Sequence, residues 1–474
     1  MEGFLKSALL LLVLVFQVLS HAQAHSVDHD FSLTRRVKVV VPIGNYYQQM
    51  AFFNQNGFDV AGVDFKSGQI DLIVTEEQYL MLKSKGVNLE VHTIQEEAML
   101  DPQYKNPDEI QAFLSAIQTQ YPNITQMVEI GRSIENRPIW AMKISDNVKM
   151  RFEYDEPTIF FNSMHHAREV MTPEIAIDII QYLTAGYGRD EKVTHWVNAN
   201  EIWIIPMVNV DGNNKVWNSN NMWRKNNRGN YGVDINRNYP YKWGECNGSS
   251  GSRYSETFRG DAAGSEPETQ AMMNFISQIR PVFSISFHSY SELVLYPGGC
   301  QGERAINKDV VEPIGKKLGQ MLGYTAGTSW EILYSVDGGD IDWMNSEFQT
   351  IPYVLEVNST REGFQPSYNQ WRDVTVNKVR VAWMYLLDML DGPAVRGVVR
   401  GIHGQFENKY VVDFYRKDAR GNYHYYHRQN SHWNGTFHVV LPPGDYKMVT
   451  INTNGEKKEK DITVENYRKN IAIE

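Results

Sequence analysis

The chain has 474 residues, of which 42% are hydrophobic and 12% aromatic, and its formal net charge is −10. That composition is typical of folded globular protein, and the length predicts two or three domains. The chain has no basic stripe, whereas a nucleic-acid surface needs clustered lysine and arginine to contact phosphates. We therefore exclude DNA and RNA as expected partners.

The N-terminus has the pattern of a secretory signal peptide over residues 1–24. Lys6 supplies the positive flank, residues 8–19 are apolar, and Ala22-Gln-Ala24 is a small-residue cleavage motif. The apolar stretch is short for a membrane span, and no other run reaches about 18 apolar residues. A retained anchor is the alternative. We expect a secreted protein, extracellular or periplasmic, with no membrane span after signal removal.

Cysteine and glycosylation patterns set further limits. The two cysteines, Cys246 and Cys300, allow at most one disulfide, and the sequence does not decide whether they pair. Asn-x-Ser/Thr sequons accept glycans only in a eukaryotic secretory pathway, so they do not identify the source. They occur at Asn123, Asn247, Asn358 and Asn434.

Residues 35–95 carry a pattern of their own. We predict strands at 37–43, at 58–74 with a break at Lys66-Ser-Gly68, and at 87–93, and helices at 46–54 and 76–85. The order βαββαβ is that of a small α+β open sandwich. It contains no visible catalytic constellation, and the polar residues 94–105 connect it to the next domain.

Residues 106–392 alternate apolar strands with amphipathic helices, which predicts an α/β fold: a mixed, mostly parallel sheet flanked by helices. Thr172 and Pro173 predict the start of one helix, as N-cap and first helical residue. Residues 243–265, rich in Gly, Ser and Asn, predict a long loop. Strands are expected at 158–162, 202–208, 282–287 and 353–357. Helices are expected at 175–183, at 376–390, and between these two, where a helix starts within 265–268 and ends at 279.

Residues 393–474 change to short strands separated by turns, which predicts a small β-sandwich. The segment Tyr423-His-Tyr-Tyr-His427 is open to two interpretations, a binding strip or an alternating half-exposed strand, and we favour the strand. We place no metal there. The strands are expected at 395–401, 411–416, 437–441, 446–451 and 457–464.

The most informative motif is His166-Ala-Arg-Glu169, followed much later by His288, each at the end of a predicted strand. Two imidazoles and one carboxylate leave the fourth position of a tetrahedral zinc open, as in catalytic sites. Ligands gather at the carboxyl ends of strands in open α/β sheets. Spacing alone does not choose between His165 and His166 as the first ligand.

A carboxylate closes another apolar strand, at Glu356. A buried carboxylate is unfavourable unless it is paired or functional, and beside zinc it would act as the base for the metal-bound water. A lone His-x-x-Glu is weak, because this spacing arises often by chance. The combination with His288 and Glu356 predicts a zinc peptidase.

The same motifs occur, in this order, in the zinc metallocarboxypeptidases related to pancreatic carboxypeptidases A and B, which residues 106–392 resemble. His166-Ala-Arg-Glu169 matches the first ligand motif and selects His166 over His165. Phe287-His288-Ser-Tyr290 matches the segment of the third ligand, and Glu356 matches the catalytic glutamate. The resemblance implies one zinc ion per chain, on His166, Glu169 and His288, and removal of a single C-terminal amino acid from peptides and proteins.

The resemblance also implies substrate-binding residues. Asp234-Ile-Asn236-Arg237-Asn238 matches the segment whose Asn and Arg bind the terminal carboxylate, for which the planar fork of Arg is suited. Tyr334 resembles the mobile tyrosine that closes over the bound terminus. We place Tyr290 among the substrate-binding residues too, and we expect Arg168 to bind upstream peptide or its carboxylate.

The arginine that stabilises the developing carbonyl charge is expected in Trp223-Arg-Lys-Asn-Asn-Arg228, which is one residue longer than the family's Trp-Arg-Lys-x-Arg. We assign this role to Arg228 and a supporting one to Arg224. The family's selectivity position falls on Ile341, which implies a pocket for apolar or aromatic side chains. Asp340 beside it would reach Lys or Arg, although a solvated loop carboxylate explains it equally well.

Beyond the catalytic domain, residues 35–95 resemble the family's inhibitory activation domain, which implies a zymogen with residues 25–105 as activation segment and linker. Relatives are cut after a basic residue, and this connection offers only Lys105. The loop pattern in 241–260 resembles secreted bacterial carboxypeptidases. Residues 393–474 resemble the transthyretin-like appendage of the regulatory branch in pattern. We expect a monomer.

Two rival functions remain. One is a peptidase on the same scaffold for cell-wall or otherwise modified peptides. The other is a non-catalytic peptide-binding relative, which would usually lack a zinc ligand or the glutamate. The three zinc ligands and the glutamate are all present in this sequence.

Overall fold

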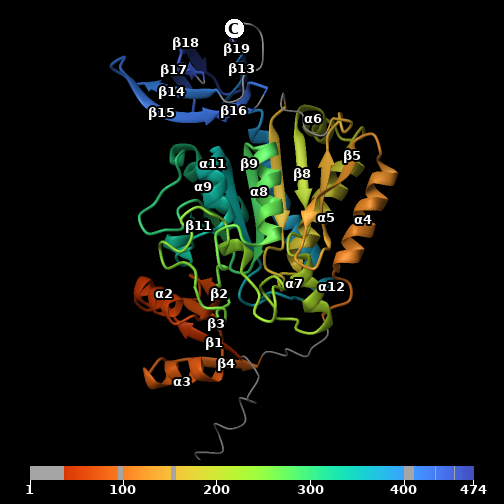
Figure 1. The fold of residues 1–474 in the computed structure, drawn as a ribbon, viewed down its shortest axis with the longest axis vertical. Helices are drawn as coiled ribbons and strands as arrows, with labels where there is room; N and C mark the ends of the chain where they lie inside the picture. Colours follow the sequence, from red (N-terminus) through yellow and green to blue (C-terminus); the bar gives the residue numbers. More distant parts are fainter. Residues whose placement is uncertain are drawn as a thin grey trace, which may run out of the picture.

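The computed structural model describes residues 37–93, 100–150, 156–399, 410–432, 434–452 and 454–473. The expected signal peptide, 1–24, lies outside these residues. Within them, no helix combines the length and apolar character that a membrane crossing requires. Three units follow one another along the molecule, with the N-terminal one (red) at one end and the C-terminal one (blue) at the other (Figure 1).

The N-terminal unit, residues 37–93, has the predicted βαββαβ order. Its antiparallel sheet has the strand order β2-β3-β1-β4. Thr75 and Gln78 form a capping box that begins the second helix. The elements are β1 (Val37–Pro42), α2 (Tyr46–Gln55), β2 (Asp59–Asp64), β3 (Gln69–Val74), α3 (Glu76–Ser84) and β4 (Glu90–Thr93).

The central unit, residues 107–389, is built around an eight-stranded sheet of order β11-β10-β12-β9-β7-β8-β6-β5. Strands β12, β9, β7 and β8 are mutually parallel, as is the outer pair β10–β11, and the other pairs are antiparallel, so the predicted mixed, mostly parallel sheet is confirmed. Its strands are β5 (Thr125–Arg132), β6 (Pro138–Ile144), β7 (Thr158–Ser163), β8 (Glu201–Ile205), β9 (Phe283–Ser289), β10 (Leu293–Tyr296), β11 (Thr325–Thr328) and β12 (Ile351–Val357).

Helices flank this sheet, and α5 packs on β7 and β9 while α12 packs on α5 and α9. They are α4 (Pro107–Gln120), α5 (Met171–Gly186), α6 (Glu191–Ala199), α7 (Val210–Asn218), the short η1 (Ile235–Arg237), α8 (Pro267–Ile279), α9 (Lys308–Leu322), α10 (Ser329–Ile332), α11 (Asp340–Phe348) and α12 (Tyr368–Met389).

The parallel strands place the predicted site residues at one sheet edge. In the β12–β9 register Glu356 lies directly opposite His288, and Ser163 at the end of β7 lies opposite Phe287 of β9. All residues of β7 and β9 are buried, as expected for strands covered on both faces. The polar ends of these buried strands therefore meet at one point.

Two helix starts differ from the prediction. Thr172 is not an N-cap, because α5 already begins at Met171 and the Thr172 hydroxyl donates to the carbonyl of Glu169 at 2.8 Å. α12 begins at Tyr368, well before residue 376. The predicted 243–265 loop is confirmed, since residues there form turns and a single isolated bridge between Ser250 and Phe258.

The C-terminal unit, residues 394–473, consists of two sheets, β16-β13-β19 and β15-β14-β17-β18. They share one apolar core, in which Val395 and Phe437 of the first sheet pack with Phe414 and Met448 of the second, so the sandwich prediction holds. Part of the predicted 395–401 strand lies outside the described residues. The strands are β13 (Ala394–Val399), β14 (Val411–Lys417), β15 (Tyr423–Asn430), β16 (Thr436–Val440), β17 (Gly444–Ile451), β18 (Lys457–Val464) and β19 (Arg468–Ile473).

Candidate active site

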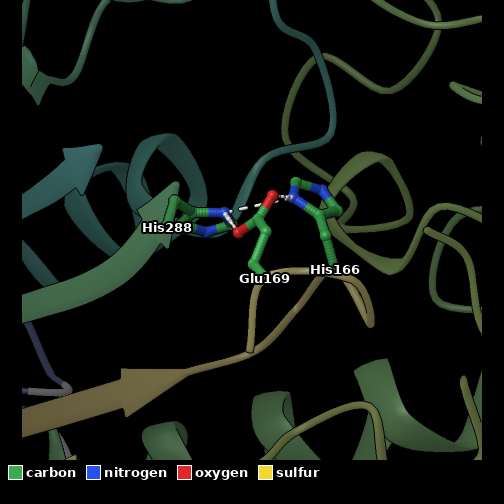
Figure 2. Close-up of side chains that lie close together, drawn as sticks. All are labelled: His166, Glu169 and His288. Atoms are coloured by element: carbon green, nitrogen blue, oxygen red, sulfur yellow. Dashed lines mark hydrogen bonds and ion pairs between the residues drawn. The ribbon is translucent and has the colours of Figure 1, made fainter. Parts of the chain in front are cut away.

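His166, Glu169 and His288 converge at the end of the parallel strands. His166 and Glu169 come from the loop between β7 and α5, and His288 from β9 (Figure 2). The Glu169 carboxylate lies 2.7 Å from Nδ1 of His166 and 3.1 Å from Nδ1 of His288, and the two Nδ1 atoms are 3.1 Å apart. All three side chains are buried.

These residues fit a zinc ion. Two ring nitrogens and a carboxylate oxygen lie within 4.8 Å of one another, and the three side chains point toward one another (Figure 2). Zinc takes nitrogen and oxygen ligands at about 2.0–2.2 Å in tetrahedral geometry, which corresponds to ligand atoms roughly 3.3 Å apart. Among the described residues this is the one such group of three. The spacing problem between His165 and His166 is thereby resolved in favour of His166.

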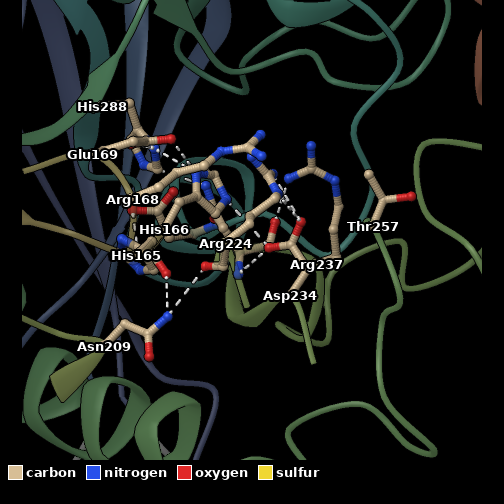
Figure 3. Close-up of polar contacts among 12 residues, drawn as sticks. His165, His166, Arg168, Glu169, Asn209, Arg224, Asp234, Arg237, Thr257 and His288 are labelled. Carbon is tan, nitrogen blue, oxygen red and sulfur yellow. Dashed lines mark hydrogen bonds and ion pairs between the residues drawn. The ribbon is translucent and has the colours of Figure 1, made fainter. Parts of the chain in front are cut away.

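Asp234 contacts the first zinc ligand, His166, and Arg224 contacts Asp234 (Figure 3). Asp234 Oδ1 lies 3.3 Å from Nε2 of His166, the ring nitrogen that points away from the ligand cluster. Arg224 donates to Asp234 Oδ2 at 2.8 Å. Burial opposes the charge on Asp234, but Arg224 and then His166 outweigh it and hold the pKa of this carboxyl well below its usual range. An ionised acceptor on the second nitrogen orients a ligand histidine and increases its basicity.

Charge is balanced within the cluster itself. Burial would raise the pKa of Glu169, but the neighbouring His166 and His288 lower it. Burial and then the charge of Arg224 lower the pKa of His166, whereas for His288 the charge of Glu169 outweighs burial and raises the pKa. A neutral imidazole and an ionised carboxylate are the forms that bind metal.

Glu356 faces this cluster from the neighbouring strand, opposite His288. It lines one cavity together with His166, His288 and Tyr334. Removal from water raises the pKa of Glu356 to about 8, against the opposing charge of His288. A bound dication would reverse the local balance and favour the carboxylate. The arrangement suits a group that takes up and returns a proton.

The same cavity is lined by Asn236, Arg237 and Tyr334. Arg237 Nη2 lies 3.5 Å from the Tyr334 hydroxyl, and Asn236 Oδ1 accepts the backbone N–H of Asp340 at 2.9 Å. Asp340 and Ile341 also line this cavity. The structure thus brings together eight of the predicted site residues, namely His166, Asn236, Arg237, His288, Tyr334, Asp340, Ile341 and Glu356.

Two other predicted residues contact the N-terminal unit. Arg168 is fully buried and makes a bidentate ion pair with Asp59, at 2.7 and 2.9 Å. The Tyr290 hydroxyl donates to Asp71 at 2.9 Å. Neither acidic residue was singled out from the sequence. Their signal was a carboxylate inside each of two apolar strands, β2 and β3, which predicts a buried partner.

The two arginines of residues 223–228 lie in different surroundings. Arg228 pairs with Glu266 at 2.7 Å and is partly exposed. Arg224 is buried and pairs with Asp234, the carboxylate that in turn contacts the zinc ligand His166. The sequence did not reveal that Asp234 connects Arg224 to His166, although Asp234 is the first residue of the Asp234–Asn238 motif. Its signal was an acidic residue directly before the apolar Ile235, where burial of the carboxylate requires a cationic partner.

Cys246 and Cys300 form a disulfide, with their Cα atoms 5.6 Å apart. This resolves the pairing that the sequence left open. The bridge joins the long 243–265 loop to the segment after β10 (Leu293–Tyr296), close to Val336, whose carbonyl lies 3.8 Å from Cys246 Sγ.

Comparison with known proteins agrees with this geometry. The zinc carboxypeptidase family model matches residues 110–379. Carboxypeptidase A1 of Sus scrofa is 28% identical over 335 residues, covering 68% of this chain and 76% of that protein. A zinc carboxypeptidase of Saccharothrix mutabilis subsp. capreolus is 31% identical over 353 residues, covering 66% and 80%.

Comparison with solved structures finds the same fold. The crystal structure of carboxypeptidase A from Helicoverpa armigera has a TM-score of 0.61 at 22% identity, over 73% of this chain and 97% of that one. This likeness concerns the fold alone. The ligand triad, the adjacent glutamate and the match over more than half of the sequence lead to one conclusion: the chain belongs to the zinc carboxypeptidase family, whose members are metal-dependent hydrolases that remove residues from the C-terminus of peptides.

Proposed function

We propose that this carboxypeptidase releases apolar or aromatic C-terminal residues, tolerates basic ones, and is secreted as a monomeric zymogen. The observation that carries the specificity is the wall of the cavity that contains the ligand histidines. Part of this wall is apolar, formed by Leu295, Leu333, Val336, Ile341 and Val354, and three carboxylates, Asp340, Asp342 and Glu356, line the same cavity.

The basic tolerance rests on Asp340. Its side chain is 1% exposed. Its Oδ2 lies 4.0 Å from Nε2 of the buried His165 and has no hydrogen-bond partner among the described residues, while Oδ1 accepts the N–H of Ile341 at 2.8 Å. A buried carboxylate oxygen without a hydrogen bond is unfavourable by about 1–3 kcal/mol or more. A lysine or arginine side chain of the substrate would supply the missing partner, and an apolar side chain would contact Ile341 instead.

We assign the chemical roles as follows. Zinc on the triad would bring the pKa of a bound water towards ~7. Glu356 takes the proton from that water and returns it to the leaving amine. Asn236, Arg237 and Tyr334 bind the free carboxylate and thereby restrict cleavage to the last peptide bond.

The positions of the two arginines suggest which of them stabilises the negative charge that develops on the carbonyl oxygen. Arg224 already lies beside the ligand cluster, so we propose it as the nearest stabilising charge. Arg228 would serve only after leaving Glu266. Loss of one such donor typically lowers the rate by ~10²–10³. Replacing each by alanine separates the two, because the larger loss in kcat identifies the donor.

We propose that the N-terminal unit keeps the enzyme inactive towards longer peptides. Arg168 and Tyr290, expected to bind upstream substrate, are occupied by Asp59 and Asp71. Activation would cut the connection between residues 94 and 105, and the catalytic domain would run from 106 to 392. Lys105 is a weak site in the folded state, because Tyr104 next to it is fully buried and its hydroxyl donates to Pro366 O.

The test uses the full chain, before and after limited trypsin treatment, on blocked dipeptides ending in free Phe, Leu, Lys, Arg or Glu. We expect turnover of Phe and Leu ends, slower turnover of Lys and Arg ends, and none of Glu ends. A zinc chelator should abolish activity and added zinc restore it. Exclusive cleavage of Lys and Arg ends would overturn the specificity proposal, and chelator-insensitive turnover would overturn the zinc mechanism.

A further inference from the structure

Arg237 is held by two backbone carbonyls. Its Nε donates to the carbonyl of Gly248 at 3.1 Å, and its Nη1 donates to that of Asn236 at 2.7 Å. The first bond closes the Nε edge of the guanidinium. The Nη1 and Nη2 end remains for a substrate carboxylate, which arginine binds through two parallel N–H groups. The position of Gly248 therefore determines how Arg237 meets the substrate.

Gly248 belongs to a turn, residues 246–249, that is bound by one buried carboxylate. Asp337 is 1% exposed. Its Oδ2 accepts the N–H of Gly248 at 2.9 Å and that of Cys246 at 3.2 Å, and its Oδ1 accepts the Ser249 hydroxyl. A carboxylate that satisfies several donors of one turn fixes the turn as a unit, because each bond to a charged acceptor is about twice as strong as a neutral one.

The approach between the two segments is close. A Cβ atom on Gly248 would lie 2.5 Å from the backbone nitrogen of Asp337. Gly338, with φ +64°, would place a Cβ 2.4 Å from the carbonyl oxygen of Arg237. The disulfide at Cys246 ties the same turn to residue 300. The turn cannot shift without moving either Arg237 or the loop that holds Asp337.

The loop that holds Asp337 leads from Tyr334 into the first turn of α11, which contains Asp340 and Ile341. One segment therefore holds the tyrosine that closes the site, the residues of the specificity pocket, and the carboxylate that orients Arg237. Val336 N–H donates to the Gly299 carbonyl at 3.0 Å and fixes the loop from the other side. Carboxylate recognition and side-chain selection share one support.

We propose that Asp337 is a positioning residue for recognition of the substrate's terminal carboxylate, acting through the 246–249 turn and Gly248 on Arg237. This inference rests on the proposed role of Arg237 in substrate binding. Asp337 itself does not line the cavity described above, so its effect on the substrate is indirect, and its hydrogen bonds to the 246–249 turn link it to Arg237.

The test replaces Asp337 by alanine in the full chain, with Asp337→Asn as the matched conservative variant. Asparagine can accept both backbone N–H groups with its oxygen and donate to the Ser249 hydroxyl, so its KM should stay within about threefold of wild type. For Asp337→Ala we expect KM for a blocked dipeptide ending in Phe to rise ~10–100-fold, with kcat within about threefold and zinc content unchanged, as for loss of binding alone.

A second readout separates carboxylate positioning from general disturbance. Calorimetry with free phenylalanine and with phenylalaninamide measures binding without turnover. Asp337→Ala should weaken binding of the acid ~10-fold or more and leave binding of the amide unchanged. Equal losses for both ligands, or wild-type affinity for the acid, would overturn the proposal.

The outcomes remain distinguishable from failure of the proposed function. An inactive wild type would count against the function, while the calorimetric comparison would still decide the role of Asp337. If Asp337→Ala does not fold, Asp337→Ser takes its place, because serine is too short to accept from both Cys246 and Gly248. Unchanged acid-over-amide preference in that variant would overturn the inference.

Discussion

The two small units contact the central one through different chemistry. The N-terminal unit places two buried carboxylates on the central unit, Asp59 on Arg168 and Asp71 on Tyr290, in addition to hydrogen bonds to backbone carbonyls such as that of Leu333. The C-terminal unit uses backbone carbonyls: Arg280 donates to Ser431 O at 2.6 Å and Gln429 to Phe348 O at 3.4 Å. The units lie at opposite ends of the molecule (Figure 1).

The difference bears on function because of what each contact occupies. Arg168 is adjacent to the ligands His166 and Glu169, and under its proposed role in substrate binding a carboxylate that pairs with it would compete with substrate for the same group. Arg280, at the end of α8, caps a helix away from the ligand cluster. The N-terminal contact should therefore control access to the site, and the C-terminal contact should affect stability alone.

The largest effect is expected at Glu356, the proposed catalytic glutamate, because the activity that the N-terminal contact would control depends on it. Glu356→Gln keeps the shape of the side chain but cannot take up a proton, so kcat should fall ~10²–10⁴-fold. Zinc content should be unchanged, because Glu356 is not a ligand in the triad. The measurement is turnover of the Phe-ended dipeptide beside metal analysis. Near-wild-type kcat would remove Glu356 from the mechanism.

The second prediction breaks the N-terminal contact. Asp59→Asn leaves the Arg168 charge buried without its partner, and breaking such a pair is destabilising by about 3–5 kcal/mol. The unit should detach from the site, and uncut enzyme should hydrolyse longer peptides ~10-fold faster or more. Peptide length dependence of kcat/KM in uncut protein measures this.

Asp64→Asn is the matched control for that variant. Asp64 lies on the same strand, but among the described residues its carboxylate accepts hydrogen bonds from the neighbouring Lys66 and Ser67 alone. It should leave turnover of long peptides as slow as in wild type. Equal activation by both changes would show that loosening the N-terminal unit, rather than freeing Arg168, relieves inhibition.

The sequence revealed the parts of the site that local pattern and sheet topology determine. His166, Glu169, His288 and Glu356 follow from strand ends, because parallel strands bring their carboxyl ends to one edge. The predicted start of α5 was wrong, because the Thr172 hydroxyl donates to the backbone carbonyl of Glu169 in the preceding loop. A strong capping pattern was overridden by the packing of the ligand loop.

The sequence could not identify side-chain partners that lie far apart along the chain. The path of residues 223–228 depends on whether each arginine finds Asp234 or Glu266, and a one-residue insertion does not determine that. The contact between Asp59 and Arg168 joins residues 109 apart. A buried carboxylate in an apolar strand signals that a partner exists, but only the tertiary fold identifies it.

The third prediction concerns acid stability at the C-terminal end. Burial lowers the pKa of His427 to about 4 and that of His432 to about 3. In the unfolded chain these rings titrate near about 6.5. The unfolded state therefore binds more protons between about pH 6.5 and about pH 4, and stability falls as pH decreases through that window.

For His427 the expected loss is at most about 3 kcal/mol, since a tenfold change in proton affinity between the folded and unfolded states corresponds to about 1.4 kcal/mol. Hydrogen exchange in β14 (Val411–Lys417) and β17 (Gly444–Ile451) at about pH 7 and about pH 5 measures it locally. His427→Gln should reduce the difference between the two pH values. The same pH dependence in variant and wild type would contradict the assignment to His427.

The smallest effect is expected at the C-terminal contact itself, where Arg280→Ala removes the hydrogen bond to Ser431 O. A bond from a charged donor contributes about 1.5–3 kcal/mol when buried and less when partly exposed, so we expect about 1 kcal/mol. The variant should lower the unfolding temperature by a few degrees and leave kcat and KM within about twofold of wild type. Arg280→Lys keeps a charged donor and should recover part of the loss. A change in KM beyond tenfold with Arg280→Ala would show that the C-terminal unit reaches the site after all, and the contrast between the two ends of the molecule would no longer hold.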